Sequence, residues 1–168
     1  MASPELLDGK PVPAGFGNVS LPDIRNLSGL EFLQGILDGK FPAPTMGRAL
    51  QFRLMEVGEG LAVFTGVPTA DYLNPMGTVH GGYAATLLDS ALGCCVQTLC
   101  PAGYASTSVE LKVNFVRPIT PKVGRLICRG TVVHPGRQIA TCEARLIGEN
   151  GKLYAHGSQT CSIFKLPV

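Results

Sequence analysis

The chain has 168 residues, a length typical of one domain with a single hydrophobic core. Hydrophobic residues make up 45% of it and charged residues only 15%, which excludes a disordered chain. The formal net charge of +2 combines −5 from residues 1–111, with five Lys and Arg against ten Asp and Glu, and +7 from residues 112–168, with nine against two. Such sparse charge indicates that part of the surface is buried against a second copy of the chain.

Membrane insertion, secretion and nucleic-acid binding are not expected. The longest stretch without a formal charge, residues 90–109, is broken by glycine and proline, whereas a membrane span needs about 20 predominantly apolar residues. The first ten residues carry two acidic side chains and lack the apolar core of a signal peptide. Basic residues in the C-terminal third occur singly rather than in a run. We therefore expect a cytoplasmic protein that binds neither membrane nor nucleic acid.

The six cysteines predict buried, reduced thiols. Cys94 and Cys95 are adjacent, Cys100 crowds the same segment, and no C-x-x-C motif occurs. A zinc site would need clustered ligands at short spacing, and the three histidines stand far from paired cysteines. No metal site is expected.

Taken in chain order, the first segment predicts an arm with one helix. Prolines and glycines in residues 1–26 indicate irregular structure. Ser28 and Glu31 then form a capping box, in which hydroxyl and carboxylate satisfy free amides at a helix start. Apolar residues follow at helical spacing until Gly39. We divide the chain into an N-terminal arm, residues 1–45, with one short helix, and a main domain, residues 46–168.

The middle of the chain predicts two strands, a loop and a central helix. Strands are expected at residues 51–57 and 61–67, joined by a glycine-rich turn. Residues 73–79 form a loop rich in turn formers. Residues 83–99 contain helix formers and no proline, with apolar residues on nearly every side, which is typical of a buried helix.

The remainder predicts four more strands, at residues 105–116, 124–134, 138–148 and 153–164. Turn residues after the second and third of these strands indicate hairpins. Several antiparallel strands with one central helix form an α+β fold in which the sheet curves around the helix. One sheet and one helix leave edges and a face unprotected, and pairing with a second copy would cover them.

Asp89 is the one formally charged side chain between Tyr72 and Val109, and it lies within the apolar helix. Burying an unpaired carboxylate costs several kcal/mol of free energy unless it is hydrogen-bonded or neutralised. Asp89 therefore either bonds a hydroxyl of its own helix, such as Thr86 or Ser90, or serves as a catalytic base or nucleophile.

His80, Gly81 and Gly82 stand where the helix begins. The first amides of a helix lack intrahelical acceptors, and glycines let a ligand approach them, as an oxyanion hole requires. The glycines could equally serve only to shape a tight turn. Gly81 and Asp89 are eight residues apart, about 12 Å along a helix, so one chain does not bring both to the same carbonyl. Two antiparallel helices across a dimer axis would.

The spacing N-x5-H-G-G-x6-D, from Asn74 to Asp89, resembles the active-site segment of hotdog-fold acyl-CoA thioesterases of the PaaI-like group. Residues 108–118 are similar to the strand that follows this family's helix, and the resemblance covers about residues 48–164. It implies a hotdog fold, a curved antiparallel sheet wrapped around one long central helix, here with an extra N-terminal helix.

The resemblance implies hydrolysis of an acyl-CoA thioester. Asp89 would activate water or attack the carbonyl itself, and the Gly81 amide would hold the thioester oxygen. Asn74 and His80 would orient water, substrate or loop. The hydroxyl that reaches the nucleophilic water would be that of Ser108, with Thr107 as the less favoured choice.

Coenzyme contacts follow from the same resemblance, because the turn at residues 134–137 is similar to one that meets the coenzyme's phosphates. The residues assigned to coenzyme binding are Gly82, His134, Gly136 and Arg137. No cofactor is expected, since coenzyme A is part of the substrate. The expected assembly is a homodimer, extended to a homotetramer as a dimer of dimers.

Two other functions remain open: an enoyl-thioester hydratase or dehydratase in which His80 acts directly, and a non-catalytic acyl-CoA-binding regulatory domain. The acyl group is also open. Tyr83, Tyr104 and Phe115 either line an aromatic or medium-chain pocket or pack the core.

Overall fold

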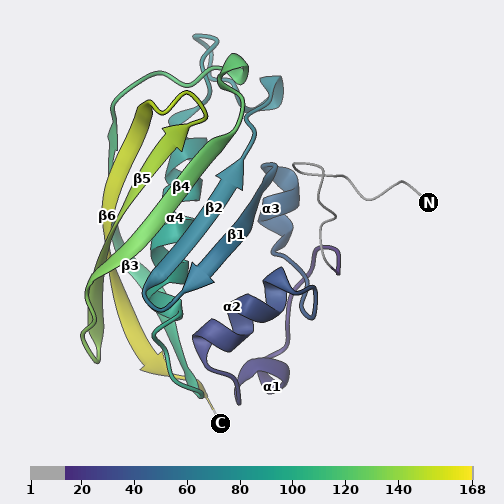
Figure 1. Ribbon diagram of the computed structural model, residues 1–168, viewed down its shortest axis with the longest axis vertical. Coiled ribbons are helices and arrows are strands. Elements are labelled where there is room, and N and C mark those ends of the chain that lie inside the picture. Colours follow the sequence, from purple (N-terminus) through teal and green to yellow (C-terminus); the bar gives the residue numbers. More distant parts are fainter. Residues whose placement is uncertain (1–13, 168) are drawn as a thin grey trace.

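The computed structural model describes residues 14–167. Six antiparallel strands form one sheet, in the order β1-β2-β4-β5-β6-β3, which curves around helix α4 (Figure 1). The strands are β1 (Phe52–Gly58), β2 (Leu61–Gly66), β3 (Tyr104–Phe115), β4 (Leu126–His134), β5 (Ile139–Gly148) and β6 (Leu153–Lys165). The helices are α1 (Leu21–Ile24), α2 (Gly29–Leu37), α3 (Thr45–Ala49) and α4 (Gly81–Gln97), with 3₁₀ turns at Ala70–Tyr72 and Pro121–Val123. The predicted α+β fold is confirmed.

The six strands and the central helix lie close to where the sequence predicts them. The capping box at the start of α2 is also confirmed, since the Glu31 amide donates to the Ser28 hydroxyl and the Ser28 amide to the Glu31 carboxylate. The expectation of irregular structure through residue 26 is wrong at α1, where Pro22 takes an early helical position that suits its fixed φ. Residues 1–13 of the expected arm lie outside the described residues, and the domain division at residue 45 stays a prediction.

The core lies between α4 and the concave face of the sheet. Alternate residues of β5 face α4, so that Ala140, Cys142, Ala144 and Leu146 are buried. Gly130 of β4 allows the closest approach, because a Cβ there would lie 2.5 Å from the carbonyl oxygen of Ala91. The helix backbone therefore lies almost directly on the sheet, and this contact fixes the distance between α4 and the sheet.

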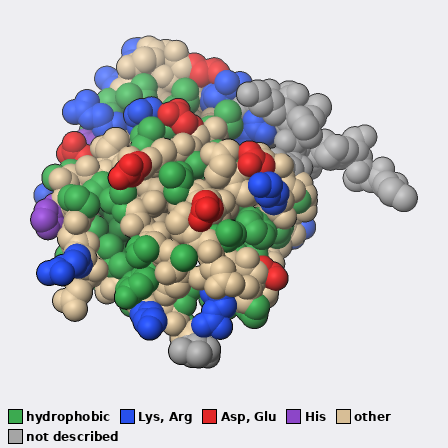
Figure 2. Space-filling model, turned by 60° about the horizontal axis from the view of Figure 1, so that its bottom comes forward, with side chains coloured by type: hydrophobic (Ala, Val, Ile, Leu, Met, Phe, Trp, Pro, Cys, Tyr) green, Lys and Arg blue, Asp and Glu red, His purple; other side chains and the backbone are tan. Residues whose placement is uncertain are grey.

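The two edges of the sheet differ. Helices α2 and α3 contact β1 and flank its edge, whereas β3 has no further strand beside it in the described part of the chain (Figure 1). Several apolar side chains of β3 are exposed, including Val109 at 57% and Phe115 at 61%. Figure 2 shows hydrophobic side chains reaching the surface between scattered charged ones on the face drawn. Within residues 14–167, no helix is long and apolar enough to cross a membrane.

Candidate active site

The N-terminus of α4 presents one uncommitted amide. His80 is the N-cap, and its Nδ1 accepts a hydrogen bond from the Gly82 amide (2.9 Å). The Tyr83 amide donates to the His80 carbonyl (3.0 Å). Among the hydrogen bonds of the described residues, the Gly81 amide has no acceptor. The positive end of the helix dipole therefore coincides with a free donor at Gly81.

Asn74 holds the loop that precedes this helix. Its side-chain oxygen accepts the amides of Met76 and Thr78 (3.0 and 3.2 Å), and its side-chain nitrogen donates to the Thr78 hydroxyl (2.9 Å). The adjoining Val79 amide donates to the carbonyl of Ile119 (2.9 Å). The side chain of Asn74 thus stabilises the loop that brings His80 and Gly81 to the start of α4.

Asp89 lies on a face of α4 that the sheet does not cover. The expectation that it is buried is wrong for the single chain, in which Asp89 is exposed. This uncovered face also carries Gly82, which is exposed, and the partly exposed Ala85 and Gly93. The hydroxyl of Thr86 does not serve Asp89, because it donates to the Gly82 carbonyl (2.9 Å). A sheet wrapped around one side of a helix leaves the opposite side open, whatever its hydrophobicity.

Two side chains from the neighbouring strands β3 and β6 hold the Asp89 carboxylate. The Ser108 hydroxyl, on β3, donates to Asp89 Oδ1 (2.9 Å). The Gln159 Nε2, on β6, donates to the same oxygen (2.7 Å) and also to Ser108 Oγ. We call these three residues the Asp89 cluster. Thr107 makes no hydrogen bond to Asp89 among those of the described residues, so Ser108 is the hydroxyl that the structure brings to the carboxylate.

Gln159 is absent from the sequence-based candidates. It is 1% exposed and lies on the buried face of β6 with Ala155, Gly157 and Cys161. The alternation of this strand was the available signal, because a carboxamide at a core-facing position needs a polar partner. Its partner Asp89 lies 70 residues earlier in the sequence, on a different element.

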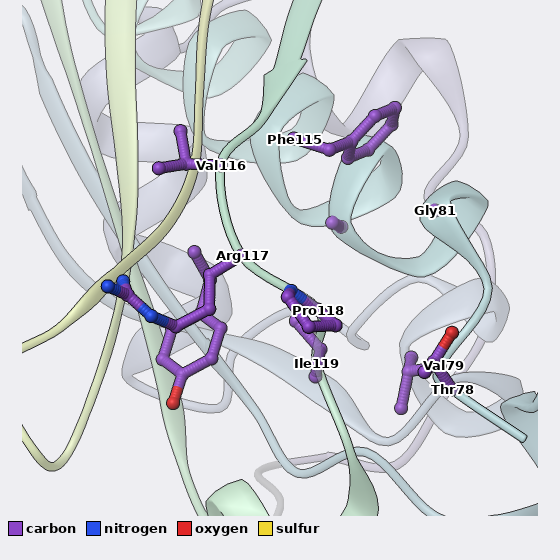
Figure 3. Close-up of a pocket in the computed structure, with 10 residues that line it drawn as sticks. Thr78, Val79, Gly81, Phe115, Val116, Arg117, Pro118 and Ile119 are labelled. Carbon is purple, nitrogen blue, oxygen red and sulfur yellow. The ribbon is translucent and has the colours of Figure 1, made fainter.

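Within one chain, Gly81 and Asp89 stay apart, because α4 is continuous and eight residues of helix span about 12 Å. A cavity of about 420 Å³ opens beside Gly81 (Figure 3). Its lining includes Ala84, Phe115 and Ile119. The Phe115 ring packs closely over Gly81, since a Cβ added there would lie 3.0 Å from its Cζ. Tyr83, by contrast, is buried in the core.

The hairpin residues assigned to coenzyme binding lie elsewhere in the chain. Gly136 and Arg137 line a second cavity, of about 480 Å³, together with Tyr104 and Leu99. Leu99 lies just after the C-terminal end of α4. His134 lies near this turn, with its Nε2 3.2 Å from the position of a Cβ on Gly136. Gly82 is at the opposite end of the helix, and its amide is already bound by His80. One chain therefore does not bring the four residues together.

Other chemistry near Asp89 is limited. Burial, with a smaller contribution from the charge of Asp89, raises the pKa of the Cys94 thiol to about 12, so this thiol stays protonated at neutral pH. Residues 14–167 contain no group of three or more His, Cys, Asp or Glu side chains arranged to hold a metal ion. The exposed Asp89 carboxylate and the free Gly81 amide are two polar groups along this helix that a ligand could meet.

The middle of the chain is similar to known thioesterases. Residues 76–155 match the family model described as the thioesterase superfamily. Acyl-coenzyme A thioesterase 13 of Mus musculus is 30% identical over 95 residues, which are 53% of this chain and 63% of that protein. A Halobacterium salinarum protein is 36% identical over 73 residues, 42% of this chain and 46% of that protein. The chain thus spans less than two thirds of either relative.

Solved structures agree with this assignment. A phenylacetic acid degradation-related protein of Ralstonia eutropha JMP134 is 27% identical, with a TM-score of 0.71 over 78% of this chain and 98% of the other. The PaaI protein of E. coli, from the phenylacetic acid degradation operon, shares the fold at 22% identity, with a TM-score of 0.70 over 83% and 100% of the two chains. Residues 76–155 thus match the thioesterase superfamily, and the described chain has the hotdog fold of its PaaI-like members.

Proposed function

We propose that this protein hydrolyses an acyl-CoA thioester to a free acid and coenzyme A. The observation that carries the proposal is the Asp89 cluster: a carboxylate held by Ser108 and Gln159 on a surface that is otherwise poor in charge. Both hydrogen bonds end on Oδ1, so Oδ2 is the oxygen available for chemistry. The match of residues 76–155 to the thioesterase superfamily and the similarity to acyl-coenzyme A thioesterase 13 support thioester hydrolysis.

In this mechanism Asp89 acts in one of two ways. As a base, Oδ2 takes a proton from water while the water oxygen bonds to the thioester carbonyl carbon. As a nucleophile, Oδ2 bonds to that carbon itself, and water later cleaves the resulting anhydride. In both cases the carbonyl oxygen becomes negative and accepts a hydrogen bond from the Gly81 amide at the positive end of α4. The C–S bond then breaks, and coenzyme A leaves as the thiolate.

The active site is shared between two copies of the chain. Gly81 and Asp89 lie about 12 Å apart along one helix, whereas both must lie about 3 Å from the reacting atoms. The uncovered face of α4 and the unpaired edge of β3 provide a continuous surface for a twofold contact. Around such an axis, Gly81 of one copy meets the partner's Asp89.

This arrangement also unites the two cavities. Within one chain β3 runs antiparallel to α4, because Phe115 lies beside Gly81 and the backbone of Ser106 donates to the Gln97 side chain. Antiparallel pairing of two β3 strands would bring the Tyr104 end of the partner toward Phe115. The partner's Arg137 then approaches the cavity beside Gly81, where it would bind a coenzyme phosphate. Assembly into a dimer of dimers and a cytoplasmic location remain predictions.

Val109→Lys is expected to yield a monomer with little thioesterase activity. Residue 109 lies near the middle of β3, so a twofold axis would place two lysines close together and oppose strand pairing by charge repulsion. Light scattering coupled to size exclusion would report the mass, and thiol release the activity. Val133→Lys is the matched control, because Val133 is 62% exposed on β4, away from the edge of the sheet. Dimers that persist in Val109→Lys would contradict pairing through β3.

The reaction itself is tested by thiol release from a panel of aromatic, short-, medium- and long-chain acyl-CoAs. Hydrolysis of at least one member is expected, and the preferred member identifies the acyl group. Hydration of enoyl-CoA without thiol release would favour the hydratase, and binding without either reaction would favour a regulatory domain. The geometry of His80 argues against the hydratase. Its Nδ1 accepts a hydrogen bond from the Gly82 amide, so the neutral ring carries its proton on Nε2. A catalytic base would need a lone pair on that nitrogen.

A further inference from the structure

We infer that Gln159 is a positioning residue for Asp89: its carboxamide anchors Oδ1 and leaves Oδ2 as the reacting oxygen. This inference rests on the proposed role of Asp89 in thioester hydrolysis. Gln159 does not touch the substrate in this scheme and acts only through Asp89 and Ser108.

The hydrogen bonds form a closed triangle that uses both amide hydrogens of Gln159. One goes to Asp89 Oδ1 at 2.7 Å and the other to Ser108 Oγ, whose own hydrogen goes to the same Oδ1 at 2.9 Å. Two donors from separate strands therefore fix the rotation of one carboxylate. A carboxylate whose one oxygen is held by hydrogen bonds keeps its other oxygen in a defined direction. Attack on a carbonyl carbon requires such a fixed direction.

The position of Gln159 makes it a rigid anchor. Strand β6 lies inside the sheet, paired with β5 on one side and β3 on the other, and Gln159 is 1% exposed. Asp89, in contrast, is exposed on the uncovered face of α4. A buried amide on a central strand thus reaches out to restrain an acidic side chain at the surface.

The unsatisfied end of the amide indicates what this arrangement serves. Gln159 Oε1 is buried and has no hydrogen-bond partner in the described residues, which costs free energy. Rotating the amide by 180° would place Oε1 next to Asp89 Oδ1, and two acceptor oxygens cannot form a hydrogen bond. The amide orientation is therefore dictated by the carboxylate. If Gln159 served only core packing, replacing it with an apolar side chain of the same length would stabilise the protein.

Gln159→Met separates the two roles, because methionine fills similar volume and has no donor. We expect kcat to fall about 10²-fold, as for a misplaced catalytic group, with KM changed less than about twofold. The melting temperature should stay the same or rise, since the unsatisfied oxygen is gone. Ser158→Ala is the matched control on the exposed face of the same strand and should leave kcat unchanged. Unchanged kcat in Gln159→Met would overturn the inference.

A double-mutant cycle shows whether Gln159 acts through Asp89. Gln159→Met should cause no further loss of kcat in an Asp89→Asn background; a further loss as large as in the wild type would overturn the inference. Gln159→Glu, which sets a second carboxylate against Asp89, should lose at least as much activity as Gln159→Met. If Asp89→Asn is fully active, the proposed role of Asp89 fails, and the positioning role of Gln159 fails with it. If Asp89→Asn is inactive but Gln159→Met is not, the positioning role alone fails.

Discussion

Asp89→Asn is expected to lower kcat for thiol release by about 10³-fold, because it removes the base or nucleophile. Asparagine has nearly the same shape, and its side-chain oxygen can still accept hydrogen bonds from Ser108 and Gln159. Its nitrogen then occupies the place of Oδ2, and an amide neither takes a proton from water at neutral pH nor attacks a thioester. Steady-state kinetics with the best acyl-CoA of the panel would measure the loss.

The control for this substitution is substrate binding. Affinity for acyl-CoA, measured by calorimetry during the slow turnover of the variant, should stay within a few-fold of wild type, since Asp89 is not needed to hold the coenzyme. Unfolding in urea should show a similar midpoint. A variant that hydrolyses thioesters at the wild-type rate would remove Asp89 from the mechanism, whereas one that fails to bind would assign it a role in recognition.

Much of the fold could be predicted because most of its elements have local sequence signals. The capping box of Ser28 and Glu31 marks α2, and alternation with turn residues marks the hairpins of β4, β5 and β6. Helices α1 and α3 have four and five residues, too few to establish a helical period, so nothing local distinguishes them from loop. The docking of α3 beside β1 depends on tertiary contacts.

The site was predictable only in part, for the same reason. Gly81, Asp89 and their spacing lie on one helix and are visible in the sequence, whereas Gln159 meets Asp89 only after β6 joins the sheet. The burial of Asp89 was mispredicted because glycine and alanine on α4 count as apolar in a pattern. On the molecule they form an open face that a single chain leaves uncovered.

Gly81→Pro is expected to lower kcat by about 10² to 10³-fold by deleting one amide donor. The helix start should tolerate it: proline suits the first helical position, and His80 has φ −58° and ψ 136°, the conformation favoured before proline. Gly81→Ala is the matched control, because it adds a similar Cβ beside Phe115 and keeps the amide. Equal losses in both variants would assign the effect to crowding instead of the lost donor.

Mixing Gly81→Pro with Asp89→Asn then tests whether the two groups come from different chains. In a mixed dimer with shared sites, one site joins both defects, and the other joins the intact Gly81 of one chain to the intact Asp89 of its partner. Random exchange makes half of the dimers mixed, so activity should recover to about one quarter of wild type. If each chain carried a complete site, every site would hold one defect and mixing would restore nothing. Different tags on the two variants and tandem purification would confirm that mixed dimers formed. Confirmed mixed dimers without thioesterase activity would contradict the shared site.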